Sequence, residues 1–311
     1  MYQYTLTFDG ESVNIRTETN LSPIFSQWKD LPSLIGVEVS LGGCHEYTVE
    51  YTDAPYRPVN YSARSVHVTL PIKQLRTGEV LLFAAMPYLE ILYQRKQVVT
   101  MHAAAVDLGG RAILLLGKTG AGKTSIALSL CRNHRAHLIG NDIVRVGMRN
   151  GLATACAGSK YFFLRQESIK RNTPDLLSLF PQSEKDSWVH KIYYLPEKLG
   201  IAVRDEPTPI RKSYLIHIDE TMDQLYTTSA NNIDTRLYLN ENMGRYIRGT
   251  AISLFDINSQ LMGYIPSFDT PELFGMRVEL METIISTTKI VYLSGNLHDV
   301  CRFIVYEMDT P

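Results

Sequence analysis

The chain has 311 residues, of which 45% are apolar and 20% are charged, and its formal net charge is −1. This is the composition of an ordinary soluble globular protein, long enough for one large or two medium domains. The 31 basic residues are balanced by 32 acidic ones, so the sequence lacks the surplus positive charge expected of a nucleic-acid-binding protein.

Nothing in the sequence indicates secretion or membrane insertion. The first residues, MYQYTLTFDGES, lack the basic segment and the apolar run of a secretory signal. The longest apolar stretch, Val80–Tyr93, is too short to span a bilayer. The four cysteines are widely spaced and form no CxxC pair, which is typical of reduced, buried thiols. We therefore expect a cytoplasmic protein with no membrane or nucleic-acid partner.

Residues 1–97 show short strands and helices and predict an α+β module. Apolar and polar residues alternate from Tyr4 to Phe8, and Asp9-Gly10 after them is typical of a hairpin turn. The alternation returns at Val66–Leu70. Ser22-Pro23 predicts a short helix that reaches about Lys29.

A longer helix is expected within residues 77–97, where apolar residues recur at helical spacing. Pro87 should kink this helix or mark its true start, because proline cannot donate the helical hydrogen bond.

Residues 98–311 have the pattern of a layered α/β domain. Val98–Val106 predicts a strand, residues 107–110 a turn, and Ala112–Leu116 a strand that is buried on both faces. Strand and helix signals alternate after this point. The segment 160–240 is poorly periodic, and we expect no particular elements there.

The C-terminal part predicts three elements in succession. Thr270 followed by Pro271 indicates the start of a helix that reaches about Thr288. Lys289–Leu293 predicts a strand, and Leu297–Glu307 predicts a final helix.

The strongest motif is Gly117–Thr124, which fits the pattern G-x-x-x-x-G-K-[ST]. An apolar strand precedes it and a helical segment follows it, as this phosphate-binding loop requires. Glycines let backbone N–H groups converge on phosphate oxygens, and the helix start adds its positive dipole end. The predicted nucleotide-binding residues are Gly117, Lys118, Thr119, Gly120, Ala121, Gly122, Lys123, Thr124 and Ser125.

An acidic residue near the end of a neighbouring strand would complete a site for a Mg²⁺–triphosphate. Asp142 follows the loop by 19 residues, counted from Lys123, and is the candidate metal ligand or general base. Thr124 is the second candidate metal ligand, through its hydroxyl. The alternative for Asp142 is an ordinary turn residue at a strand end.

The stretch from Met101 to Val144 resembles the catalytic core of the HPr kinase/phosphorylase superfamily. Within it, the stretch is most similar to the HPr-kinase-related kinases of peptide and small-molecule biosynthesis, such as lasso-peptide kinases. His102 on a hairpin strand, the glycine-rich loop and the pair Asn141-Asp142 carry this resemblance. The last strand and helix fit more loosely, and the first hundred residues hardly fit.

The resemblance implies a P-loop kinase core of the HPr kinase and phosphoenolpyruvate carboxykinase type. It implies that ATP and Mg²⁺ are used and that phosphate is transferred to a hydroxyl, usually of serine. Lys123, His102 and Asp142 would then be the catalytic residues. Asn141 stands where the family has its first aspartate, so Asp142 alone would have to act as base and metal ligand, or activity is altered. The segment with which HPr kinases grip their carrier protein is not recognisable, so HPr is not the expected acceptor.

A second cationic group often clamps the acceptor or the γ-phosphate. The candidates are Lys160, Arg165, Arg245 and Arg248. Arg248 is attractive because the adjacent Gly249 permits a ligand to approach closely. The alternative for each is a solvated surface side chain, and the alternative for His102 is a histidine hydrogen-bonded within the core.

Three functions are compatible with these residues. The first is an ATP-dependent kinase acting on a hydroxyl of a small molecule or peptide. The second is a non-catalytic nucleotide-binding regulator, in which Asn141 reports lost chemistry, and the third is a nucleotide-hydrolysing switch. The sequence leaves open the acceptor and the choice between ATP and GTP, and the resemblance is compatible with a homo-oligomer.

Overall fold

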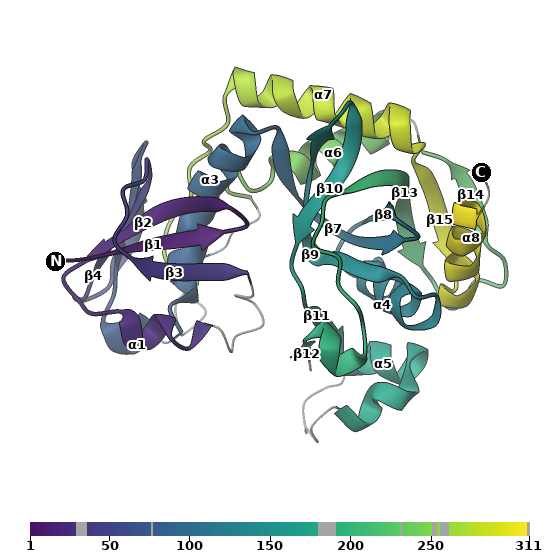
Figure 1. The fold of residues 1–311 in the computed structure, drawn as a ribbon, viewed down its shortest axis with the longest axis horizontal. Helices are drawn as coiled ribbons and strands as arrows, with labels where there is room; N and C mark the ends of the chain where they lie inside the picture. Colours follow the sequence, from purple (N-terminus) through teal and green to yellow (C-terminus); the bar gives the residue numbers. More distant parts are fainter. Residues whose placement is uncertain are drawn as a thin grey trace. The chain divides into compact units, whose positions relative to one another are not determined.

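A computed structural model describes residues 1–28, 36–75, 77–179, 191–230, 232–250, 254–255 and 261–309. The fold is mixed α/β and divides into two compact units (Figure 1). The first unit contains Met1–Thr100 and Asn240–Val278, and the second contains Met101–Leu239 and Glu279–Pro311. The sequence pattern predicts one domain over 98–311, whereas Asn240–Val278 belongs to the first unit.

Within the described residues, the first unit is built on a six-stranded mixed sheet with the order β3-β1-β2-β4-β6-β5. Strands β2, β4 and β6 run parallel to one another, and the other pairs are antiparallel. The predicted turn at Asp9-Gly10 joins β1 to β2, and both residues have positive φ, 43° and 84°. The strands are β1 (Tyr2–Phe8), β2 (Glu11–Thr17), β3 (Val37–Leu41), β4 (Thr48–Thr52), β5 (Arg57–Tyr61) and β6 (Ser65–Thr69).

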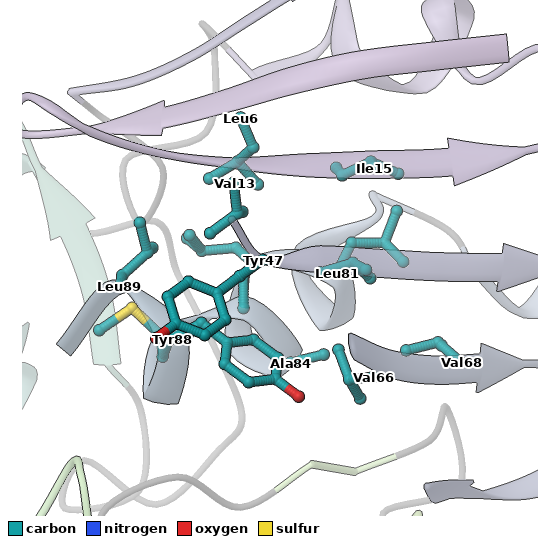
Figure 2. Packing of buried hydrophobic residues seen from close by; sticks show 14 of the residues in the cluster. Leu6, Val13, Ile15, Tyr47, Val66, Val68, Leu81, Ala84, Tyr88 and Leu89 are labelled. Carbon is teal, nitrogen blue, oxygen red and sulfur yellow. The ribbon is translucent and has the colours of Figure 1, made fainter. Parts of the chain in front are cut away.

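One long helix, α3 (Glu79–Arg95), packs on this sheet over β2, β4 and β6. Tyr88 of α3 stacks on Tyr47 with the ring centroids 4.8 Å apart, and Figure 2 shows this pair among the buried aliphatic side chains. The helix begins at Glu79 and runs through Pro87, so the expectation that Pro87 marks its start is wrong. Pro87 is buried in this core, and the packing outweighs the lost hydrogen bond.

Two short helices, α1 (Ser22–Phe25) and α2 (Ile72–Leu75), complete the N-terminal part of the unit. The predicted helix at Ser22 therefore ends at Phe25, and Lys29 lies outside the described residues.

The segment Asn240–Val278 belongs to the first unit because it shares the same core. Ile247, Met262 and Leu273 are buried in one cluster with residues of the sheet and α3. The amide of Val59 in β5 donates a 2.6 Å hydrogen bond to the carbonyl of Met262. Sequence periodicity could not show this, because the contact joins residues some 200 positions apart.

A buried polar network also links this segment to α3. Arg277 is 1% exposed and donates to Gln94 Oε1 at 2.7 Å and to Asp269 Oδ2 at 2.5 Å. Arg248 donates to the same Asp269 oxygen at 2.9 Å. Both arginine charges are thus held by one carboxylate.

Within the described residues, the second unit contains a seven-stranded sheet with the order β10-β9-β7-β8-β13-β15-β14. Strands β8, β13 and β15 are parallel, as expected for a layered α/β domain. The strands are β7 (Val98–Leu108), β8 (Arg111–Leu116), β9 (His137–Arg149), β10 (Leu152–Gly158), β13 (Thr208–Ile218), β14 (Tyr226–Ser229) and β15 (Val291–Gly295), and a separate ribbon pairs β11 (Phe162–Arg165) with β12 (Lys191–Tyr194).

Helices cover both faces of the sheet. Helices α4 (Lys123–Asn133) and α8 (Leu297–Asp309) share a core with Tyr214 of β13. On the other face, Ser213 of β13 receives a 2.8 Å hydrogen bond from Thr288 of α7 (Pro271–Thr288), since neighbouring strand residues point to opposite faces.

The predicted strands at 98–106 and 112–116 and the three C-terminal elements are confirmed. In the segment 160–240, where the sequence predicts no particular element, the structure adds α5 (Gln166–Asn172), two 3₁₀ turns and α6 (Ile233–Gly244) to the strands named above. Within the described residues, no helix is both long enough and apolar enough to cross a bilayer.

Candidate functional site

The glycine-rich loop Gly117–Gly122 joins the end of β8 to the start of α4 in the second unit. Gly117, Gly120 and Gly122 all have positive φ, at 148°, 84° and 99°. Residues with a Cβ rarely adopt these angles, so the path of the loop requires glycine at these positions. The motif is therefore placed between a strand and a helix, as its sequence predicts.

Strand β13 holds the loop closely from one side. A Cβ added to Gly122 would lie 2.3 Å from Cγ1 of Ile218, and one added to Gly117 would lie 2.9 Å from the carbonyl oxygen of Ile216. The amide of Ile218 also donates to the carbonyl of Ala121 at 3.0 Å. Packing thus fixes the loop in addition to its φ angles.

The side chain of Lys123 folds back across the loop. Its Nζ donates to the carbonyls of Gly117 at 2.9 Å and Lys118 at 3.1 Å, and the residue is 6% exposed. An ammonium held by loop carbonyls at the first turn of α4 places a positive charge where anionic oxygens would bind.

Tyr238 of α6 holds the first glycine of the loop, although the sequence does not indicate Tyr238 as a site residue. Its hydroxyl accepts from the amide of Gly117 at 2.8 Å and donates to the carbonyl of Gly117 at 3.0 Å. Tyr238 lies 121 positions from Gly117 in a poorly periodic segment, so no pattern in the sequence could have indicated the contact.

Thr124, in the first turn of α4, contacts Asn141 rather than Asp142. Its hydroxyl donates to Asn141 Oδ1 at 3.0 Å, and Asn141 Nδ2 donates to the carbonyl of Tyr161 at 3.2 Å. Asn141 is 1% exposed. Two oxygen atoms, from a hydroxyl and an amide, therefore lie together beside the loop.

Asp142 lines a cavity beside the glycine loop, together with Thr124 and Asn141, and lies next to His102 of β7. Its Oδ1 is 3.7 Å from His102 Nδ1, and the side chains are 46% and 18% exposed. This separation suits an ion pair and is longer than a good hydrogen bond. The structure thus brings His102 and Asp142 together and leaves the carboxylate accessible.

A distortion of β9 allows both Asn141 and Asp142 to line one cavity. Consecutive side chains of a regular strand point to opposite faces. Asp142, however, has a φ of 72°. It lies in the middle of β9, whereas the sequence predicts a position near a strand end. A left-handed non-glycine residue of this kind is costly and is typical of functional sites.

A second part of the cavity wall is formed by β11 and α5. Arg165, Ser168 and Asn172 line it, together with Thr173 just after the helix. Ser168 Oγ is 3.2 Å from Ser125 Oγ on α4, so the two walls meet at a pair of hydroxyls. Figure 1 shows that β11 leads directly into α5.

Of the four candidate cations, only Arg165 is among the described residues that line this cavity. Lys160 Nζ instead donates to the carbonyls of Ile139 and Arg204, both at 2.6 Å. Arg245 and Arg248 belong to the first unit. The expected role of Gly249 is also wrong, because the space beside it is filled by Ile265, whose carbonyl oxygen would lie 2.8 Å from an added Cβ.

The buried thiols do not contribute a nucleophile. Burial raises the pKa of Cys131 on α4 to about 12, so this thiol stays protonated at neutral pH.

Comparisons with known proteins give no family assignment. The sequence matches no protein-family model and no curated protein. Among solved structures, the chain is similar to the Hpr(Ser) kinase/phosphatase from Coxiella burnetii, with a TM-score of 0.27 and 15% sequence identity over 42% of this chain and 70% of that chain. Any function must therefore be argued from the site itself.

Proposed function

We propose that the chain is an ATP-dependent kinase that transfers the γ-phosphoryl group to a hydroxyl of a small molecule or peptide. The observation that carries this proposal is the cavity itself. It places a glycine loop with Lys123, the oxygen pair of Thr124 and Asn141, and the accessible carboxylate of Asp142 around one space. Phosphoryl transfer needs mainly positioning and charge neutralisation, and these groups supply both.

The loop would bind the phosphates of ATP. Its backbone N–H groups and the N-terminus of α4 attract anionic oxygens. Lys123 would exchange its two carbonyl partners for phosphate oxygens, and its charge would then offset the charge that develops on the transferred group.

The oxygens near the loop fit a hard cation. Thr124 Oγ1 and Asn141 Oδ1 are 3.0 Å apart, and Asp142 lines the same cavity. Mg²⁺ prefers such oxygen donors and keeps several waters and phosphate oxygens of its own. These three residues would hold the cation, which would neutralise charge on the β- and γ-phosphates. Asn141 brings no charge, so Asp142 would supply the only protein carboxylate.

The acceptor hydroxyl would lose its proton to Asp142. The hydroxyl oxygen forms a bond to Pγ, the bond from Pγ to the bridging oxygen of ADP breaks, and the O–H proton passes to the carboxylate. His102, 3.7 Å from Asp142 Oδ1, would orient the carboxylate and then relay the proton to solvent.

The test is nucleotide turnover with and without a panel of hydroxyl-bearing acceptors, monitored by release of ADP. The kinase requires that an acceptor stimulates ADP release and that the acceptor gains a phosphate detectable by mass spectrometry. Asp142→Asn should abolish transfer while ATP still binds, whereas Asp223→Asn, at an exposed carboxylate of the same unit, should leave transfer unchanged. Turnover near wild type in Asp142→Asn would remove this residue as the base.

One observation favours a second function, a non-catalytic nucleotide-binding regulator. The residue that contacts the loop threonine is the amide Asn141 and not a carboxylate. Binding of ATP without ADP release under any acceptor condition supports the regulator. Release of ADP that no acceptor stimulates supports a hydrolysing switch instead.

A further inference from the structure

The roles proposed above leave one wall of the cavity unused. This wall continues from Ser125 and Leu128 of α4 across to Ile169 and Asn172 of α5 and to Thr173. We call these five residues the α5 wall.

The position of the reactive groups determines which part of a nucleotide reaches this wall. The γ-phosphate must face His102 and Asp142, because the acceptor proton leaves there. The rest of the nucleotide must therefore leave the loop away from that pair. The cavity offers a path along α4, where Leu128 follows Thr124 by four residues, or about 6 Å along the helix axis.

The α5 wall combines apolar surface with directional polar groups. Leu128 and Ile169 line the cavity and are each 2% exposed, so they give this part of its lining an apolar character that suits a base. The polar groups lie close together around Ser168 of α5, which contacts polar groups from both helices of the wall. Its Oγ is 3.2 Å from Ser125 Oγ and accepts a hydrogen bond from Asn172 Nδ2 at 3.5 Å.

Thr173 provides a second, independent observation that points to a ligand at this wall. It lines the cavity and is 7% exposed. Among the residues that the structure describes, none forms a hydrogen bond with its Oγ1. A buried hydroxyl without a partner is costly, so a ligand group that pairs with it would gain affinity.

We infer that the α5 wall is the subsite for the nucleoside of the phosphate donor, and that the carboxamide of Asn172 contacts the base. A carboxamide presents a donor beside an acceptor and can pair with the acceptor and donor edge of adenine, whereas a carboxylate presents acceptors only, which suit the two adjacent N–H groups of guanine. This inference rests on the proposed function, because it takes the phosphates to lie in the glycine loop.

The experiment compares the affinity of MgATP, MgGTP and inorganic tripolyphosphate for the full chain by calorimetry. Tripolyphosphate has the phosphates without the nucleoside. Thr173→Val, which keeps the shape of the side chain, should weaken MgATP about fivefold and leave tripolyphosphate unchanged. Asn172→Asp should shift the ATP-to-GTP preference towards GTP by at least about fivefold. Thr287→Val, at an exposed helix position, is the control.

The outcomes separate the two proposals. Loss of tripolyphosphate binding in Lys123→Ala supports the phosphate site, and retention of wild-type binding overturns the proposed function. If the wild type binds tripolyphosphate, the proposed nucleoside subsite is contradicted when the wild type binds MgATP no more tightly than tripolyphosphate. It is also overturned when both wall variants keep the wild-type nucleotide preference, or when they affect the KM of an acceptor instead. Should Thr173→Val fail to fold, Thr173→Ser keeps a hydroxyl and must retain the affinity for MgATP.

Discussion

The hydroxyl of Thr124 donates a hydrogen bond to Oδ1 of Asn141 at 3.0 Å, across the gap between α4 and β9. The hydrogen-bond partner of Thr124 is therefore Asn141 and not the neighbouring carboxylate of Asp142. The side chain that would share a cation with Thr124 is therefore neutral, and the negative charge of the site lies with Asp142.

Replacing this amide by a carboxylate tests the arrangement. Asn141→Asp should lower the Mg²⁺ concentration needed for half-maximal ATP binding, because Mg²⁺ prefers a charged oxygen to an amide oxygen. The measurement is a Mg²⁺ titration at fixed ATP, followed by calorimetry. Asn150→Asp, in an exposed turn, is the matched control. An unchanged Mg²⁺ dependence would show that this oxygen does not face the cation.

Lys123→Ala should weaken MgATP binding by at least about tenfold, since it removes a buried ammonium at the start of α4. Lys118→Ala changes the same residue type at an exposed position of the same loop and should have a much smaller effect. Fluorescence titration with a labelled ATP analogue measures both. Equal losses in the two variants would mean that only the general positive charge of the loop matters.

The loop glycines predict a graded loss of stability. Gly122→Ala combines a φ of 99° with a clash against Ile218, and should lower the free energy of unfolding by about 2 kcal/mol or more. Gly120→Ala has a φ of 84° but no atom within 4 Å of an added Cβ, so about 1 kcal/mol is expected. Urea unfolding compares the two variants, and similar losses would contradict the role of β13.

Tyr238→Phe should leave the fold intact and loosen the glycine loop. The lost hydroxyl makes two hydrogen bonds to Gly117, so we expect about 1 kcal/mol of lost stability. MgATP affinity should fall a few-fold, because the loop is less well ordered before it binds. Tyr226→Phe, at a half-exposed ring, controls for the loss of a phenol. Hydrogen exchange at the loop amides would remain at the wild-type rate if Tyr238 did not hold the loop.

The first unit should lose stability in acid through Asp269. Burial raises the pKa of this carboxyl, but the hydrogen bonds and charges of Arg277 and Arg248 outweigh burial, so the pKa lies below the ordinary value of 3.8. The stabilising contribution is therefore present above about pH 4 and is lost as the pH falls through the lowered pKa. Asp269→Asn should lower the free energy of unfolding at pH 7 by about 3 kcal/mol, because it leaves Arg277 buried without its charge partner.

Denaturant unfolding of wild type and variant from pH 7 to pH 2.5 checks this prediction. The difference between the two proteins should shrink below pH 4. A constant difference over the whole range would contradict it.

Local patterns in the sequence predict most of the elements that form the site. The run of apolar residues at Ala112–Leu116 and the glycine spacing after it are sufficient to place the loop between β8 and α4, since both signals act within a few residues.

Contacts between distant segments could not be predicted in this way. Tyr238 holds Gly117 from a helix that has weak periodicity, and the positive φ of Asp142 falls in the middle of a strand, where the sequence predicts a strand end. Arg248 was a candidate for the site on its local context alone, but its partner Asp269 is 21 residues away. Pairings of this kind are set by the packed core and leave no local signal.

The division of the chain has a practical consequence for dissecting it. A fragment that starts at Met101 still carries Asn240–Val278, whose apolar side chains Ile247, Met262 and Leu273 are completed by strands encoded before residue 100. In such a fragment these apolar side chains would be exposed to water, and the fragment should aggregate. Excising 240–278 and bridging the cut with a flexible linker is the sounder way to isolate the unit that carries the glycine loop.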